Sequence, residues 1–202
     1  MSRAARAPAG RGRRPGGPDT RGEILSSARE SFAGKGFEGT TIRAVAAAAG
    51  VDPALVHHYF GTKDDLFIAA LELPFDPREM APEILGGGLD GAGERLLTVF
   101  LTVWDNPDTR LPLAALLRAG ATGEPAASLL RDGILRMVLA ALAEVLDPAE
   151  AKVRGELVAS QLLGLALARY LLAVEPLASV PAADLITWMA PNLQRYISGD
   201  FL

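Results

Sequence analysis

The segment from residue 40 to residue 63, TTIRAVAAAAGVDPALVHHYFGTK, constrains the fold more than any other part of this chain. A threonine at either of its first two positions can cap a helix, and Gly50 can take the left-handed backbone conformation that ends one. Asp52 can cap the next helix, and Pro53 suits its first turn because an N–H at that position would have no partner. The segment therefore predicts two short helices joined by a tight turn.

The second short helix has two distinct faces. Val56 and Phe60 lie one turn apart and are predicted to pack inward, so Ala54, His57 and His58 share the opposite face. Such a helix, held against a helix of small residues, has the geometry of a helix-turn-helix, whose second helix enters the DNA major groove. Two short helices with Gly between them also occur in many all-α proteins, and the spacing alone leaves that alternative open.

A longer ordered string surrounds this segment. It comprises Gly50-Val51, then Tyr59-Phe60, then the run TKDDL at 62–66. With the helical pattern before it, the string resembles the DNA-binding domain of the tetracycline-repressor (TetR) family of bacterial regulators, from about residue 20 to about residue 71. Two departures leave the operator sequence open. The family often has an aromatic residue at the position of His57, and Gly-Thr or Pro-Thr at 54–55.

The resemblance implies DNA contacts for a defined set of residues. The residues that match phosphate contacts of the family are Thr41, Tyr59 and Lys63, and Arg43 matches a position that can reach a base or a phosphate. The residues that match the groove-facing positions are Pro53, Ala54, His57 and His58. Separately, Thr62 and Asp65 have capping-box spacing, so a helix is predicted to begin at Lys63, where its N-terminus favours a phosphate, and to continue to about Leu73. Thr20 and Glu23 have the same spacing at the start of the first helix. The Pro- and Gly-rich segment 75–93 is predicted to be a short helix at 78–85 and a flexible connection. For the two histidines, an exposed and solvated pair remains the alternative.

The charges of the chain are unevenly distributed. Residues 1–63 carry ten Lys and Arg and five Asp and Glu, a net charge of +5, whereas residues 64–202 carry ten and nineteen, a net charge of −9. Residues 1–18 contain almost no large apolar side chain and are predicted to be disordered when free. Their arginines make them a candidate arm that follows DNA phosphates or enters the minor groove. A tail that only improves solubility is the alternative. These arginines are Arg3, Arg6, Arg11, Arg13 and Arg14.

The composition argues against several other functions. The chain contains no Cys, so neither a disulfide framework nor a thiolate metal site is predicted. Its two histidines are adjacent, and its Asp and Glu residues form no close catalytic pair, so we predict no metal site, no cofactor and no enzymatic activity. No apolar run is long enough to span a bilayer, and no secretory signal is visible. A cytoplasmic protein associated with the nucleoid is therefore predicted.

The second half of the chain is predicted to be helical throughout. Helical patterns cover residues 90–105, 107–121, 124–146, 148–174 and 181–197, and no stretch shows the period-two alternation of a strand. We therefore predict an all-α protein with three parts. They are a disordered basic arm (1–18), a three-helix helix-turn-helix domain (19–73) and a helical domain for ligand binding and dimerisation (74–202).

Two apolar helices at the end of the chain suggest a dimer. The segment 153–174 is apolar nearly all round, and the last helix carries one apolar stripe, which together resemble the dimer interface of the TetR family. The predicted interface residues are Leu162, Leu163, Leu167, Tyr170, Leu185, Met189, Leu193 and Tyr196. Packing within one chain is the alternative. Two recognition helices related by a twofold axis would read a palindromic site.

The remaining helices are predicted to surround a small apolar ligand. The resemblance implies this site, and the candidates are Phe100, Trp104, Leu113, Leu117, Ile134, Met137 and Val138. The same residues would suit an ordinary core. The strings WDNP (104–107), LLR (116–118) and SQLLG (160–164) are similar to a subgroup of these regulators that is frequent in high-GC bacteria, and we expect an actinobacterial type of C-terminal domain.

The sequence thus predicts a dimeric repressor that binds a palindromic operator and is released by a small apolar molecule. One alternative is a helical protein-interaction module without operator binding. Another is a regulator that activates or that needs no ligand.

Overall fold

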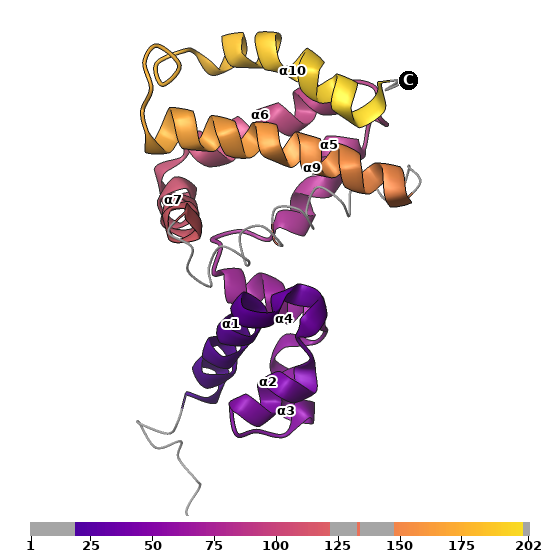
Figure 1. The fold of residues 1–202 in the computed structure, drawn as a ribbon, viewed down its shortest axis with the longest axis vertical. Helices are drawn as coiled ribbons and strands as arrows, with labels where there is room; N and C mark the ends of the chain where they lie inside the picture. The colour runs from indigo at the N-terminus through magenta and orange to yellow at the C-terminus, as the bar shows by residue number, and fades with distance from the viewer. Residues whose placement is uncertain (1–18, 122–132, 134–147, 200–202) are drawn as a thin grey trace, which may run out of the picture.

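The computed structural model describes residues 19–121, 133 and 148–199, and within these residues every regular element is a helix. The predicted all-α class is therefore confirmed. Figure 1 shows two groups of helices, with α1 to α4 at one end of the molecule and α5 to α10 at the other. The predicted arm and most of the predicted helix at 124–146, including Ile134, Met137 and Val138, lie outside the described residues.

The first group consists of α1 (Thr20–Gly39), α2 (Ile42–Ala48), α3 (Pro53–Phe60) and α4 (Lys63–Leu71). These helices close around an apolar core in which Phe32, Val45 and Val56 have no exposed surface. The ring of Phe67 meets the rings of Phe32 and Phe37 edge-on, with centroid distances of 5.0 and 5.2 Å. Aromatic edge-to-face packing of this kind fixes how the helices sit against one another.

The starts and ends of these helices follow local side-chain chemistry. Asp52 accepts a hydrogen bond from the N–H of Ala54 at 2.8 Å, and Thr62 and Asp65 form the predicted capping box. Gly50 has a φ of 68°, which confirms the predicted turn between α2 and α3. The cap of α1 differs from the prediction. Asp19 rather than Thr20 accepts from the first turn, because its carboxylate reaches the N–H of Gly22 at 3.0 Å.

The end of α4 also differs slightly from the prediction. The helix was expected to continue to about Leu73, but it ends at Leu71 because Glu72 adopts a left-handed conformation with a φ of 51°. Arg29 of α1 forms an ion pair with Glu72 and donates to the carbonyl of Ala70 at 3.3 Å. The end of α4 is therefore attached to α1.

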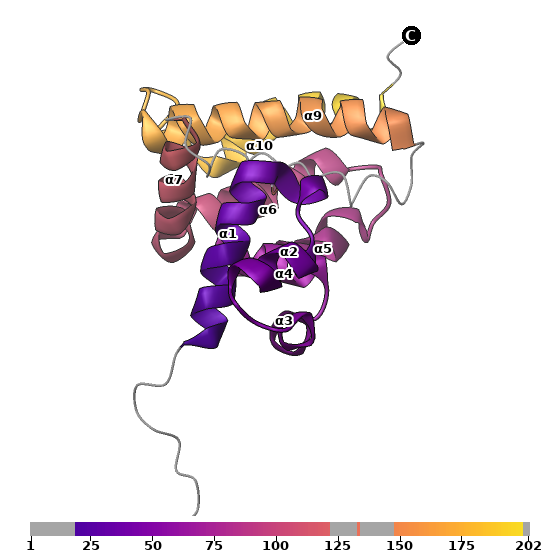
Figure 2. The same ribbon diagram turned by 60° about the horizontal axis from the view of Figure 1, so that its bottom comes forward.

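The second group begins with a short 3₁₀ turn, η1 (Pro77–Met80), and continues through α5 (Ala81–Leu85), α6 (Ala92–Asp105) and α7 (Pro107–Ala121). It ends with α9 (Pro148–Leu165), the π-helical segment η2 (Ala166–Leu171) and α10 (Ala182–Ser198). Helices α6, α9 and α10 lie side by side (Figures 1 and 2). Their shared core includes Leu97, Leu101, Val158, Leu193 and Ile197.

Helices α6 and α10 touch through their backbones at Gly93. A side chain there would lie 2.6 Å from the backbone N of Gln194 and 2.7 Å from the carbonyl O of Ala190. The N–H of Gly93 donates to Oε1 of Gln194 at 2.9 Å, and Nε2 of Gln194 donates to the carbonyl of Leu89 at 2.8 Å. The close approach therefore requires glycine.

Candidate nucleic-acid interface and apolar cavity

Helix α3 lies at the end of the molecule farthest from α10, as both views show (Figures 1 and 2). Val56 anchors it because its side chain is completely buried, whereas Ala54, His57, His58 and Tyr59 are exposed. Thr41 and Arg43, at the start of neighbouring α2, are exposed too, and Pro53 is partly exposed. The structure thus brings all these predicted DNA-contact residues to the α2–α3 end of the molecule.

The side chain of His57 folds towards the turn that follows α3. Its Nδ1 lies 2.7 Å from the carbonyl O of Gly61, and the N–H of Gly61 donates to the carbonyl of His57 at 2.9 Å. Gly61 has a φ of 80°, a left-handed value that favours glycine. The ring of His58 instead meets the ring of Tyr59, with centroids 5.6 Å apart.

Lys63 is the first residue of α4, as predicted, and its ammonium lies over an aromatic ring. The Nζ atom is 4.2 Å from the centroid of the Phe37 ring, a cation–π distance. This contact holds a positive charge at the N-terminus of α4, where the helix dipole also favours an anion. Both features suit a DNA phosphate.

The helical part of this end is not basic by itself. Residues 19–73 contain five Lys and Arg and eight Asp and Glu, a net charge of −3, so the excess positive charge of residues 1–63 comes from the arginines of residues 1–18. The basic character inferred from the sequence therefore belongs to the arm and not to the three-helix unit.

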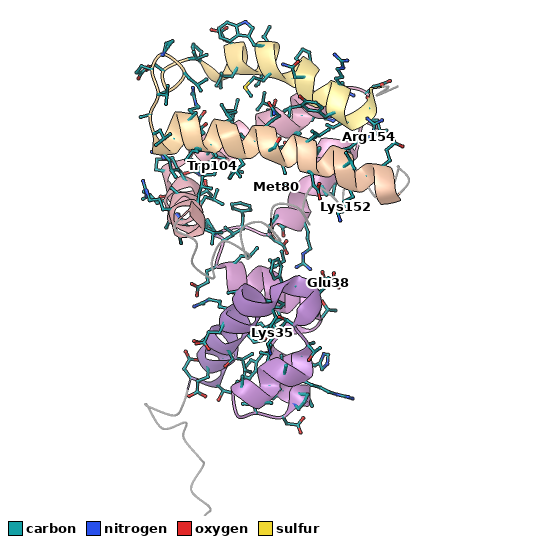
Figure 3. The ribbon with its side chains drawn as sticks, in the orientation of Figure 1. Lys35, Glu38, Met80, Trp104, Lys152 and Arg154 are labelled. Atoms are coloured by element: carbon teal, nitrogen blue, oxygen red, sulfur yellow. The ribbon has the colours of Figure 1, made fainter. Side chains whose placement is uncertain are left out.

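A cavity of about 170 Å³ lies in the second group of helices and extends to the end of α4. Four of the predicted ligand residues, Phe100, Trp104, Leu113 and Leu117, line it. The prediction missed the walls supplied by the end of α4 and by the segment after it, namely Leu71, Leu73, Phe75, Met80 and Ile84. Figure 3 shows Met80 and Trp104 on the side of α9 that faces the first group. Large apolar residues in the Pro- and Gly-rich segment 74–88 were the signal for this wall.

Tyr170 packs against Trp104, one of the residues that line the cavity. Its ring stacks on Trp104 at 5.2 Å, and its hydroxyl donates to Oδ1 of Asp105 at 2.8 Å. Burial, with a further contribution from the hydrogen bond to Asp105, raises the pKa of the Tyr170 hydroxyl. The ring of Tyr170, which was predicted at a dimer interface, thus packs against Trp104 of its own protomer and remains partly exposed.

The other predicted interface residues divide into two sets. Leu162, Leu185 and Leu193 are buried in the protomer's own core, which leaves their side chains no surface to offer a partner, and Met189 and Tyr196 pack partly against that core. Leu163 and Leu167 of the segment α9–η2 are exposed by 40% and 39%, and Leu163, like Leu162, lines the cavity. Trp188 of α10, which was not among the predicted interface residues, is exposed by 61%. The apolar pattern identified two packed helices correctly but did not distinguish their inner and outer faces.

Arg78 connects η1 to the start of α4. Its guanidinium donates to Oδ1 of Asp65 at 2.6 Å and to both carboxylate oxygens of Asp76 at 2.6 to 3.1 Å. Oδ2 of Asp65 accepts from the backbone N–H and the hydroxyl of Thr62 at 2.9 and 2.6 Å. The bonds from Thr62 and Arg78 lower the pKa of Asp65 to about 2, and Arg78 also lowers that of Asp76. We refer to these four residues, Thr62, Asp65, Asp76 and Arg78, as the Arg78 cluster.

Within the described ranges no group of His, Asp and Glu could hold a metal ion, and no helix there is long and apolar enough to cross a bilayer.

Comparison with known proteins gives consistent matches over both groups of helices. Residues 24–70 match the family described as bacterial regulatory proteins, tetR family, and residues 90–197 match the tetracyclin repressor-like C-terminal domain. The crystal structure of a TetR-family regulator from Streptomyces coelicolor A3 is 40% identical, with 92% of this chain and 98% of that chain aligned and a TM-score of 0.51.

Curated relatives match over the first group of helices. The HTH-type transcriptional repressor AcnR of Corynebacterium glutamicum is 38% identical over 71 residues, which are 35% of this chain and 37% of that repressor. The HTH-type transcriptional regulator BetI of Brucella anthropi is 41% identical over 54 residues, which are 27% of this chain and 28% of that regulator. The match therefore spans about a third of the length of these relatives.

Proposed function

The chain belongs to the TetR family of bacterial regulatory proteins, which are DNA-binding transcriptional regulators and not enzymes, and we propose that it is a dimeric repressor of a palindromic operator. The observation that carries the proposal is the exposed face of α3 at one end of the molecule, with the N-termini of α2 and α4 beside it. This arrangement suits a recognition helix in the major groove with phosphate contacts on either side. The proposed function implies a cytoplasmic protein associated with the nucleoid.

The proposed dimer uses the outer face of the last two long helices. Leu167 and Trp188 expose apolar surface, and Gly164 has no neighbouring atom within 4 Å of where a side chain would begin. Burial of exposed Leu and Trp against a second copy would remove apolar surface from water. A twofold axis at this face would carry two α3 helices to half-sites roughly 34–36 Å apart.

The proposed regulator of DNA binding is a small neutral molecule in the cavity. Every lining residue in the described ranges is apolar, and the volume of about 170 Å³ resembles that of an engineered cavity of about 150 Å³ that binds benzene. A ligand changes operator affinity only through its different affinities for the two conformations of the protein.

Two features support a link between the cavity and DNA binding. Leu71 and Leu73 join the cavity wall to α4, and Pro77 and Met80 of η1 line the cavity next to Arg78. The Arg78 cluster reaches the residues that begin α4. A displacement of η1 would therefore change the position of the residues that begin α4, where a phosphate contact is proposed.

The proposal is tested by binding of the purified protein to DNA from upstream of its own gene and to random DNA, across a salt series. Tight, selective binding that weakens steeply with salt, and that Lys63→Ala and Tyr59→Ala both reduce, would support the operator proposal because phosphate contacts release counterions. Equal binding to a genomic fragment library and to random DNA, unaffected by both changes, would contradict it.

Deletion of residues 2–18 tests the arm separately. Because the helical part of this end has a net charge of −3, the deletion is expected to flatten the dependence of log K on log salt by up to about 4 for each protomer. An unchanged slope would show that the arginines only improve solubility.

A further inference from the structure

We propose that His57 is a specificity-determining residue whose Nε2 accepts a hydrogen bond from the exocyclic amino group of an adenine or a cytosine in the major groove. This inference rests on the proposed function and names the class of base that the α3 face recognises.

The carbonyl of Gly61 determines which nitrogen of the His57 ring carries the proton. A carbonyl oxygen only accepts hydrogen bonds, so at 2.7 Å the Nδ1 of His57 must be the donor. In the neutral ring Nε2 is then an acceptor, since one ring nitrogen donates and the other accepts. The hydrogen bond thus selects one tautomer.

The turn after α3 holds this carbonyl in place. Gly61 is fixed to α3 by the hydrogen bond from its N–H to the carbonyl of His57, at 2.9 Å. The next residue, Thr62, is fixed by its backbone and hydroxyl bonds to Asp65. The ring therefore has a defined orientation as well as a defined tautomer before DNA binds.

An acceptor at this position discriminates among the bases. Adenine presents its N6 amino group and cytosine its N4 amino group in the major groove, whereas guanine presents N7 and O6 and thymine presents O4, which are acceptors. Nε2 of neutral His57 can pair with the first two and is repelled by the others. It is also a poor partner for a phosphate oxygen, which only accepts.

His58 provides a matched control. It is the next residue on the same exposed helix, and among the described residues its ring has an edge contact with Tyr59 and no hydrogen bond to the backbone that would select a tautomer. A comparison of the two histidines therefore isolates the effect of the Gly61 carbonyl from that of an imidazole on α3.

The test is selection of binding sites from a random duplex library at pH 8. Every base pair carries one amino group in the major groove, on adenine or on cytosine, so the wild-type protein is expected to fix which base pair stands at one position of each half-site and which strand carries that amino group. His57→Ala should lose the preference at that position alone, and His58→Ala should keep it. A weakening by His57→Ala that is equal for all sequences would indicate a phosphate contact and overturn the inference.

Base analogues in the selected site test the hydrogen bond itself. Replacing the selected adenine by purine, or the selected cytosine by 2-pyrimidinone, removes the amino group and should lower wild-type affinity about 3- to 10-fold. It should change the affinity of His57→Ala very little. An analogue that lowers the affinity of both proteins equally overturns the inference. If wild-type protein selects no site, the operator proposal fails, whereas a selected site that ignores His57 overturns only the role of His57.

Discussion

The two groups of helices are stabilised in different ways. Each of α1 to α4 begins at a side chain that accepts a hydrogen bond from the first turn, namely Asp19, Thr41, Asp52 or Thr62. In the second group, α5, α6 and α10 begin without such a bond, whereas η1 and α7 have one, from Asp76 and Asn106. The first group closes around aromatic rings packed edge to face, whereas the second contains a partly open apolar cavity of about 170 Å³.

This difference shows how one chain combines a fixed surface with an adaptable interior. Caps and edge-to-face rings are directional, so they favour a single arrangement of α1 and α4, against which α2 and α3 pack. Apolar contacts are not directional, and a wall beside an empty volume has fewer contacts to lose when it shifts.

The largest effect is expected from a core aromatic residue in the first group. Phe32→Ala should lower the free energy of unfolding by about 3–5 kcal/mol, because Phe32 is completely buried against Phe37 and Phe67. Phe100→Ala should cost clearly less, since Phe100 is partly exposed and already lines the cavity. Equilibrium urea denaturation measures both values. Equal losses of stability would contradict the proposed difference in packing between the two groups.

Added volume should have opposite consequences in the two groups. Ala28→Leu should lower the free energy of unfolding by about 1–3 kcal/mol, because Ala28 is completely buried in the filled core. Ala166→Leu, at an almost equally buried residue that lines the cavity, should change it by less than about 1 kcal/mol. The same denaturation experiment measures this pair. A large loss for Ala166→Leu would show that the cavity cannot accept added atoms.

Loss of a cap should have a moderate effect. Thr62→Ala is expected to cost about 1 kcal/mol, because it leaves an N–H in the first turn of α4 without its acceptor. Thr98→Ala in the interior of α6 is the control, where the exposed hydroxyl bonds only to the carbonyl of Glu94 and alanine has the higher helix propensity. Thermal unfolding should show a lower midpoint for the first variant and an unchanged or higher one for the control.

The smallest effect concerns pH. The pKa of Asp65 is lowered from its ordinary value of 3.8 to about 2, so its stabilisation is present above about pH 4 and is lost as the pH falls towards 2. Asp65→Asn should therefore be less stable than wild type at pH 6, by less than about 1 kcal/mol because the cluster is partly exposed, and this deficit should shrink below pH 4.

The control for this prediction is the Arg78→Ala background. The second-largest cause of the low pKa of Asp65 is its bond to Arg78, so the deficit of Asp65→Asn should be smaller there. Denaturation curves at pH 6 and pH 3 measure the difference, and a deficit that does not depend on pH or on Arg78 would contradict the proposed ion pairing.

The sequence predicted the first group well because its signals are local. The turn at Gly50, the cap at Asp52 and the capping box at Thr62 depend on residues within a few positions of one another. The pattern is ambiguous where two neighbouring residues are both able to cap a helix, and the cap of α1 is Asp19 instead of Thr20. The existence and type of each helix follow from such signals, and the terminal residue does not.

The candidate sites of the second group depend on contacts that spacing does not encode. Tyr170 and Leu185 have the apolar period of an interface, but the same period describes a helix packed inside one chain. Met80 lines the cavity from a segment that composition marked only as a connection. Arg78 pairs with Asp65, thirteen residues earlier, because the chain turns back between α4 and η1.

The crossing at Gly93 determines how far a displacement spreads through the second group. Backbone contact and the hydrogen bond from Gly93 to Gln194 join α6 to α10, and Gln194 also bonds to Leu89 just before α6. Helix α6 contributes Val99, Phe100 and Trp104 to the cavity wall, whereas Trp188 of α10 is exposed. A molecule that displaces α6 is therefore expected to move α10 with it, which couples the exposed face of α10 to the contents of the cavity.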